Sequence, residues 1–171
     1  MPARGSLRDA RIISLIIAAI VIALDRWSKL WIVRHIRIGH ARTIIPGVFR
    51  LTHVLNTGAA FSLFEGSTSP AMVRNMLIAF SVLAVIVVLA LLWKYGRQFS
   101  LISFSLALIL GGALGNLYDR VRYSHVVDFL EVHIVHYHWP DFNLADSAIV
   151  VGGVVLVLDA LFSSPKEESE S

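Results

Sequence analysis

The sequence predicts a mainly α-helical membrane protein with four transmembrane helices, a small extracytoplasmic antiparallel β element and a long loop outside the membrane. Composition is the first observation behind this prediction, because 56% of the residues are hydrophobic and only 16% are charged. Soluble domains carry roughly 25% charged residues. The second observation is a mean hydropathy of +0.71, and the third is a set of uncharged stretches near the ~20 residues that span a bilayer. One integral membrane domain over residues 1–171 accounts for this length.

Charge and cysteine content exclude several classes of function. The net charge of +3 arises from basic residues spread along the chain, without a dense Lys/Arg patch carrying interleaved aromatics. Nucleic acid is therefore not an expected partner. The chain has no cysteine, which excludes disulfide bonds, thiolate metal sites and a cysteine nucleophile.

The N-terminal region predicts a retained first helix rather than a cleaved signal peptide. A short basic tail, residues 1–11, precedes a predicted span at residues 12–33. The apolar run ends in Asp25-Arg26-Trp27-Ser28-Lys29 instead of a small-residue cleavage site. Lys29 lies one helical turn after Asp25, so the two side chains share a face and are predicted to pair.

The interval 34–70 is too long to be a simple turn and is predicted to hold the β element. Residues 43–45 and 48–55 are rich in β-branched and aromatic side chains, and Pro46-Gly47 between them is a turn signal. We expect a small antiparallel pair of strands on the membrane surface. The small residues 56–62 follow it without a helical or strand period.

The rest of the chain continues the alternation of apolar spans and polar segments. The predicted segments are spans at 71–93, 98–118 and 147–162, an outer interval at 119–146 and a polar tail at 163–171. The third span ends with Gly111, Gly112 and Gly115. Small residues at such spacing let helix backbones approach one another closely.

Four spans place both termini on the same side of the membrane. Basic residues mark the cytoplasmic side. The two sides carry equal numbers of Lys and Arg, but those on the side of the termini occupy much shorter segments. Their density favours cytoplasmic termini, with the intervals 34–70 and 119–146 facing outward.

Two aspartates are the strongest candidates for chemistry. Asp128 and Asp146 each lie at the edge of a hydrophobic stretch, where a carboxylate is costly unless it is paired or used. They flank one loop, so they can converge, share one proton and activate a water molecule. From residue chemistry alone, a purely structural role for both aspartates is as well supported as a catalytic one. Asp146 could then be the N-cap of the apolar helix that follows it.

Other polar residues fall at the same predicted surface. Asn56, Asn116 and Asn143 could bind a peptide backbone or orient the aspartates, although turns and caps are common roles for asparagine. Asp119 and Arg120 are adjacent and are interpreted as a local ion pair that fixes the loop.

A group of histidines in the outer interval raises the question of a metal site. His125, His133, His136 and His138 lie near Glu131, but their spacing matches no H-E-x-x-H pattern and no cysteine joins them. An amphipathic interfacial loop is the favoured interpretation, and no metal is predicted. The chain also has no G-x-S-x-G and no phosphate-binding loop.

Taken together, these motifs match those of a known protein family. The chain resembles signal peptidase II, the family of bacterial prolipoprotein signal peptidases, which are membrane aspartic proteases. The resemblance covers about residues 12–162, in the family's order. The matching stretches are Asp25-Arg26-Trp27-Ser28-Lys29, Asn56-Thr57-Gly58-Ala59-Ala60-Phe61-Ser62, Gly111-Gly112-Ala113-Leu114-Gly115-Asn116-Leu117-Tyr118-Asp119-Arg120, Val126-Val127-Asp128-Phe129 and Phe142-Asn143-Leu144-Ala145-Asp146.

The resemblance implies a function and a set of site residues. Asp128 and Asp146 would be the catalytic pair, with no metal or organic cofactor. The substrate groove would be lined by Asn56, Gly58, Asn116, Arg120 and Asn143. Supporting roles are expected for Asp25, Lys29 and Asp119.

The implied substrates are prolipoproteins carrying a diacylglyceryl-cysteine, cut just before that cysteine. The implied place is the bacterial cytoplasmic (inner) membrane, with the active site at its outer, periplasmic face. A mobile loop or short helix over the site is also implied. Besides substrate, membrane lipid is the expected partner, and we expect a monomer.

Two functions from other classes remain as alternatives. A small proton-coupled transporter would use intramembrane carboxylates as relays, but it would normally show internal repeats and carboxylates near the bilayer midplane. A scaffold without catalytic activity would leave the interface carboxylates and the asparagine-rich loop without a role.

Overall fold

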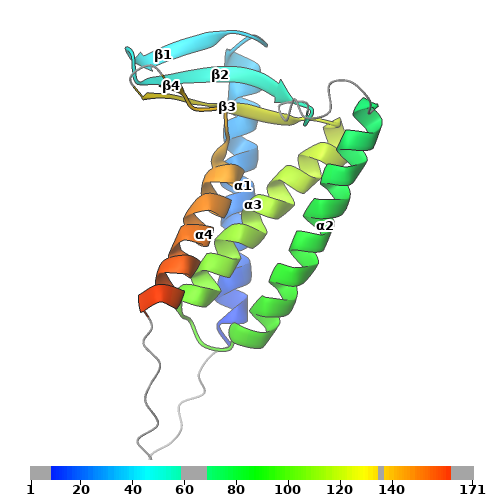
Figure 1. Cartoon of the computed structure of the whole chain (residues 1–171), viewed down its shortest axis with the longest axis vertical. Coiled ribbons are helices and arrows are strands. Elements are labelled where there is room, and N and C mark those ends of the chain that lie inside the picture. Colours follow the sequence, from blue (N-terminus) through cyan, green and yellow to red (C-terminus); the bar gives the residue numbers. More distant parts are fainter. Residues whose placement is uncertain (1–8, 59–68, 135–136, 163–171) are drawn as a thin grey trace, which may run out of the picture.

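The computed structural model describes residues 9–58, 69–134 and 137–162. Four long helices run side by side, and a small sheet lies across one end of them (Figure 1). The elements are α1 (Arg11–His35), β1 (Ala41–Ile45), β2 (Phe49–Asn56), α2 (Pro70–Tyr95), α3 (Leu101–Tyr123), β3 (Val126–Ile134), β4 (Tyr137–His138) and α4 (Leu144–Phe162). The helical fold with a small antiparallel sheet confirms the predicted fold class in outline.

Three of the described helices are long and apolar enough to cross a membrane. They are residues Ala71–Tyr95 of α2, together with α3 and α4. Helix α1 has 25 residues, but Asp25, Arg26 and Lys29 interrupt its apolar sequence. Of these, Asp25 and Lys29 are buried, so α1 places its charges inside the protein.

Helix starts follow the local sequence. The Ser69 hydroxyl accepts a hydrogen bond from the Met72 backbone N–H at the start of α2, where Pro70 occupies the first turn. Ser100 and Ser103 form a reciprocal capping box at the start of α3. Helix α3 ends at Tyr123, and the residue that caps it, Ser124, has a left-handed φ of 65°.

Helix α3 is the centre of the bundle and packs against the other three helices. Close approach depends on two adjacent glycines. A Cβ on Gly111 would lie 2.8 Å from the Ala18 carbonyl oxygen of α1, and one on Gly112 would lie 2.3 Å from the Ala145 carbonyl oxygen of α4. The small residues therefore act as the sequence predicted, by bringing helix backbones together.

The sheet has the order β1-β2-β3-β4, with antiparallel neighbours throughout. Its first two strands are the predicted hairpin, and Gly47 in the turn has a φ of 73°. Strand β3 differs from the prediction, because the interval 119–146 was expected to be a loop. The first four residues of β3 are all buried, so the strand lacks the alternating polarity by which strands are usually recognised.

The sheet is fixed to the bundle by a second apolar core. Ile32 and Ile36 near the end of α1 pack with Val127 and Phe129 of β3. The Ile36 carbonyl oxygen also lies 2.7 Å from Nδ1 of His53 in β2. The upper end of α1 therefore supports both central strands of the sheet.

Two helices extend beyond the predicted spans by three residues or more. Helix α3 continues past residue 118 to Tyr123, and α4 begins at Leu144 rather than at 147. Polar residues in these added turns bond to neighbouring elements, as described below. The helices are thus longer than their apolar segments because their polar ends have partners inside the protein.

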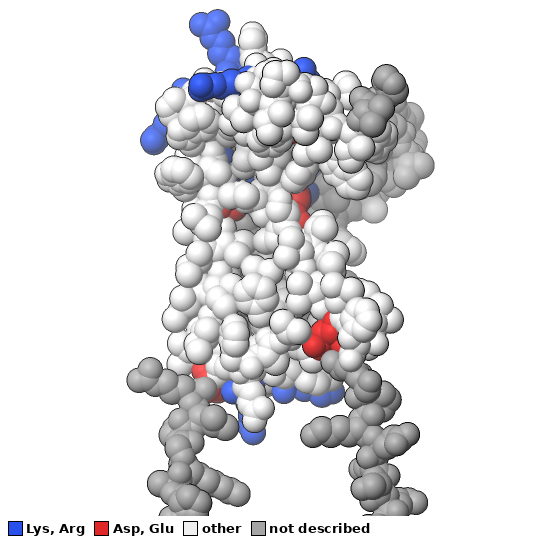
Figure 2. Space-filling model, turned by 90° about the vertical axis from the view of Figure 1, so that its left-hand side faces the viewer, with Lys and Arg blue, Asp and Glu red and all other residues white. Residues whose placement is uncertain are grey.

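Charges are distributed unevenly along the molecule. On the face in Figure 2, Lys and Arg gather at the two ends, and a band with few charged atoms separates them. Large apolar side chains of α2, such as Phe80, Leu83 and Ile86, are also exposed. This pattern fits a protein whose middle section faces lipid.

Replacing Gly112 with alanine should destabilise the bundle by about 1 to 3 kcal/mol, the usual cost of overpacking a close contact. The new Cβ would collide with backbone rather than with a flexible side chain. The measurement is the free energy of unfolding in detergent micelles. Gly153→Ala on α4 is the matched control, because a Cβ there meets no atom within 4 Å. Equal stability of the two variants would contradict this packing.

Candidate active site

The two predicted aspartates meet where β3 passes the start of α4. Asp128 lies within β3 and Asp146 lies in the first turn of α4. One residue contacts both. The Asn143 side-chain Nδ2 donates to Asp128 Oδ1 at 2.7 Å, and the Asn143 backbone N–H donates to Asp146 Oδ2 at 3.3 Å. Asn143 is fully buried, so it holds the two carboxylates in a fixed relation.

Asn143 is the residue that caps α4. Its Oδ1 accepts the backbone N–H of Asp146 at 3.0 Å, and Asp146 Oδ2 accepts the backbone N–H of Asn143 in return. These reciprocal bonds form a capping box. The interpretation of Asp146 as the N-cap is therefore wrong, because the helix begins earlier and Asp146 occupies its third position.

The hydrogen bonds that Asp128 accepts come from amide groups. Asp128 is 2% exposed, and its Oδ2 accepts a hydrogen bond from Asn56 Nδ2 at 2.9 Å. Asn56 is oriented in turn by the Gly58 backbone N–H, which donates to Asn56 Oδ1 at 2.8 Å. Both oxygens of Asp128 thus have neutral donors from β2 and from the start of α4.

Burial raises the pKa of Asp128 from its ordinary 3.8 to about 6. The hydrogen bonds from Asn56 and Asn143 lower that pKa, while the nearby charge of Asp146 raises it. The increase in pKa caused by removal from water is larger than the decrease caused by the amide hydrogen bonds. A carboxyl group with such a pKa can hold a proton near neutrality, which is typical of groups that exchange protons during catalysis.

A buried ammonium group lies beneath the aspartates. Lys29 is 1% exposed, and its Nζ lies 2.7 Å from Asp25 Oδ2, 2.7 Å from Asp119 Oδ2 and 3.1 Å from Asn116 Oδ1. All three donors of the ammonium are therefore used. The predicted pairing of Asp25 with Lys29 is present.

This ammonium determines how Asn116 faces the site. Because Asn116 Oδ1 accepts from Lys29, its Nδ2 is directed the other way and donates to Asp146 Oδ1 at 2.7 Å. Asp25 completes the connection to α4, since its Oδ1 accepts the Ala145 backbone N–H at 3.0 Å. Lys29 thus orients Asp146 through Asn116 and positions α4 through Asp25.

The predicted ion pair between Asp119 and Arg120 is not formed. Asp119 instead pairs with two residues of α1, Lys29 at 2.7 Å and Arg26 at 3.3 Å. Neighbouring residues on a helix point in different directions, so Asp119 faces α1. Arg120 is half-buried, and the charges of Asp146 and Asp128 act on it.

Gly58 closes the other side of this region against α2. Its φ of 89° favours glycine, and a Cβ there would lie 2.4 Å from a methyl carbon of Leu77. The rest of the predicted small-residue segment, residues 59–62, lies outside the described residues.

The histidine-rich segment forms a separate group on the sheet. His133 and His138 lie beside Glu131, within a cluster of possible metal ligands. His125 is not part of that cluster, and His136 lies outside the described residues.

One residue of this region was not singled out from the sequence. Arg26 pairs with Asp119, bonds to the Tyr123 hydroxyl and lies over the Tyr118 and Tyr123 rings. Arg26 lies three residues before Lys29 and therefore on the same face of the helix. This spacing in the sequence indicated that Arg26 could share partners with Lys29. The capping box of Asn143 and Asp146 was also visible as their spacing in the sequence.

The fold and the site are compatible with a membrane-type aspartic peptidase, because apolar helices carry a sheet and Asn143 connects two carboxylates where the two meet. Sequence comparison narrows this class to one family. The model of the signal peptidase (SPase) II family matches residues 17–162, and the chain belongs to that family.

Relatives and solved structures agree with this assignment. The lipoprotein signal peptidase of Desulforapulum autotrophicum is 42% identical over 151 residues, covering 86% of this chain and 91% of the relative. That of Burkholderia mallei is 45% identical over 145 residues, covering 85% of each. A solved structure described as a bacterial membrane enzyme superposes with a TM-score of 0.78 at 29% identity, covering 92% of this chain and 93% of the other.

The raised pKa of Asp128 predicts how stability depends on pH. The folded protein holds this proton more tightly than the unfolded chain, so the contribution of Asp128 to the unfolding free energy is fully present below about pH 4 and is lost as pH rises through about 6. A shift from 3.8 to about 6 corresponds to about 3 kcal/mol of lost stability across this window. Chemical denaturation at several pH values measures it. Asp128→Asn should remove this part of the slope, and an unchanged slope would contradict the shift.

Replacing Lys29 with methionine should cost about 3 to 5 kcal/mol of stability, because two buried carboxylates lose their shared partner. The measurement is the unfolding free energy in detergent micelles. The double variant Lys29→Met/Asp25→Asn should regain part of the loss, since Asp119 keeps Arg26 as its partner. Lys94→Met at the exposed end of α2 is the control. A double variant no more stable than Lys29→Met would exclude charge balance as the cause.

Proposed function

We propose that the chain is an endopeptidase that removes signal peptides from diacylglyceryl-modified prolipoproteins, using Asp128 and Asp146 to activate water. The observation that carries this proposal is the bridge of Asn143 between the two carboxylates. It holds them at one place, with Asp128 buried and Asp146 at a helix start. Membership of the signal peptidase II family supports the substrate class.

Different surroundings favour different roles for the two groups. Asp146 accepts hydrogen bonds from a backbone N–H and from Asn116, and it lies in the first turn of α4. A helix N-terminus stabilises negative charge, so we assign the role of general base to Asp146. Asp128 is more deeply buried and has only amide donors, so it is the proton donor.

These roles give a balanced hydrolysis. Asp146 takes a proton from water as the water oxygen attacks the carbonyl carbon of the scissile peptide bond. Asp128 gives its proton to the carbonyl oxygen, so a tetrahedral diol forms. As the carbon–nitrogen bond breaks, the proton held by Asp146 passes to the leaving nitrogen of the lipidated cysteine, and a diol hydroxyl returns its proton to Asp128. No covalent intermediate is needed, which agrees with the absence of cysteine.

The same geometry supports a proposed arrangement of four helices in the membrane. Helix α1 crosses with the three apolar helices, because its charged residues near Asp25 are neutralised inside the protein. The sheet then lies at the outer, periplasmic face and both termini lie in the cytoplasm. A lipid anchored in the outer leaflet would present its cysteine at the level of the aspartates, while its acyl chains stay beside the helices.

A proton-coupled transporter is the weaker candidate. The two aspartates lie where the helices meet the sheet, rather than halfway along the helices (Figure 1). Transporter sites typically lie near the bilayer midplane. The family assignment also favours peptide hydrolysis.

The test is cleavage of a diacylglyceryl-modified prolipoprotein by the purified protein in lipid or detergent. Asp128→Asn and Asp146→Asn should each reduce the rate by several orders of magnitude, because each removes a proton-transfer group. Asp159→Asn is a matched control on α4, since Asp159 lies far along the helix from Asp146. It should retain the wild-type rate.

The precursor without its diacylglyceryl group completes the design. The wild-type protein should cut only the lipidated form, at the bond before the cysteine. Cleavage at wild-type rates by both aspartate variants would exclude the proposed pair. A folded wild-type protein that cuts neither form would exclude the proposed substrate.

A further inference from the structure

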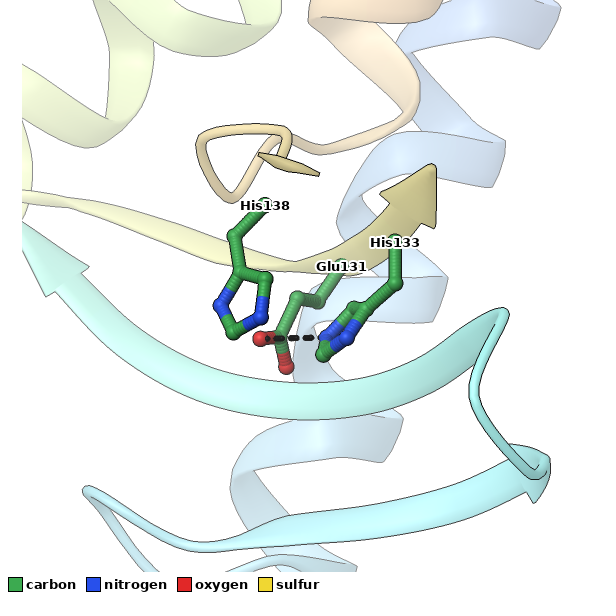
Figure 3. A group of neighbouring side chains, drawn as sticks. All are labelled: Glu131, His133 and His138. Atoms are coloured by element: carbon green, nitrogen blue, oxygen red, sulfur yellow. Dashed lines mark hydrogen bonds and ion pairs between the residues drawn. The ribbon is translucent and has the colours of Figure 1, made fainter. Parts of the chain in front are cut away.

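Three metal-ligating side chains converge on the sheet, apart from the two aspartates. They are Glu131 and His133 of β3 and His138 of β4, and one ligand atom of each lies within 4.8 Å of the others. Figure 3 shows both imidazoles directed toward the carboxylate of Glu131. Glu131 is buried, His133 is half-buried and His138 is exposed, so the group is open on one side.

Strand geometry explains why these residues meet. Glu131 and His133 are two positions apart on β3, so their side chains lie on the same face of the strand. His133 and His138 are directly opposite one another in the pairing of β3 with β4, and their ring centroids are 4.1 Å apart. Backbone pairing therefore brings the three side chains together, which sequence spacing alone does not reveal.

The distances suit a small divalent cation. His133 Nε2 lies 2.9 Å from Glu131 Oε1. Zn²⁺ bonds of about 2.0 to 2.2 Å in a tetrahedral site place neighbouring ligand atoms about 3.3 Å apart. A small side-chain movement would thus replace this hydrogen bond by two bonds to a shared ion. Imidazole and carboxylate groups are both ligands that Zn²⁺ accepts.

We propose that Glu131, His133 and His138 form a binding site for Zn²⁺ or a similar divalent cation, with water completing its coordination. The site is distinct from the two aspartates, because Glu131 lies three strand positions from Asp128, about 10 Å along β3. It takes no part in peptide hydrolysis and does not depend on the proposed function.

Arg50 affects how strongly this site can bind a cation. Its Nε and Nη2 donate to the two carboxylate oxygens of Glu131 at 2.7 and 2.6 Å. This bidentate ion pair orients the carboxylate within the cluster. The guanidinium also repels a cation, so binding should be weaker than at a site without Arg50.

The experiment is equilibrium dialysis of the full-length protein, purified without a histidine tag in detergent, against Zn²⁺ with metal analysis. We expect saturable binding of one Zn²⁺ per chain. His133→Gln and His138→Gln should each weaken binding by about tenfold or more, since even a supporting partner is worth about that much. His125→Gln is the matched control, because the imidazole of His125 is outside the cluster. This variant should bind Zn²⁺ with the same affinity as the wild-type protein.

Two further measurements make the outcome decisive. His138 is exposed, so His138→Gln should fold even if His133→Gln does not, and thermal unfolding without metal checks both. Arg50→Gln should bind Zn²⁺ more tightly, because the competing charge is gone. The proposal is overturned by an absence of saturable binding, by binding that survives His138→Gln unchanged, or by an Arg50→Gln affinity no higher than that of wild type.

Discussion

The buried ammonium of Lys29 is the interaction on which the rest of the site depends. The side chain of Lys29 is 1% exposed, so its three donors must find acceptors within the protein, and it finds them on two helices. Asp25 thereby fixes α4 through the Ala145 N–H, while Asn116 is turned toward Asp146. A neutral side chain of the same size would fill the space without giving these groups a direction.

Pairing of charges inside the protein also reconciles a polar site with a lipid environment. Asp25, Asp119, Lys29 and Arg26 form two positive and two negative charges in contact, so the bundle buries no net charge at this level. The outer surfaces of the helices can then remain apolar. Glycines of α3 shorten the distance between helices, which brings the short side chains of aspartate and asparagine within bonding range.

Local chemistry in the sequence predicted those features that depend on nearby residues. The spacing of Asp25 and Lys29 predicted their pairing, and the β-branched residues around Pro46-Gly47 predicted the hairpin. Features that depend on distant partners were missed. Strand β3 is buried on both faces, and Asp119 faces α1 rather than its neighbour Arg120. Nothing within a few residues of these positions specifies those contacts.

The site contains contributions from both ends of the chain, and this affects when it can form. Ala145 and Asp146 belong to α4, the last of the described helices along the chain, and Asn143 caps that helix. The Ala145 backbone N–H bonds to Asp25 of α1, the first of the described helices. Domains form as the chain emerges from the ribosome, N-terminal parts first. Until α4 docks, Asp128 has no Asn143 and no second carboxylate. A nascent chain therefore lacks the complete arrangement of carboxylates and asparagines until α4 has docked.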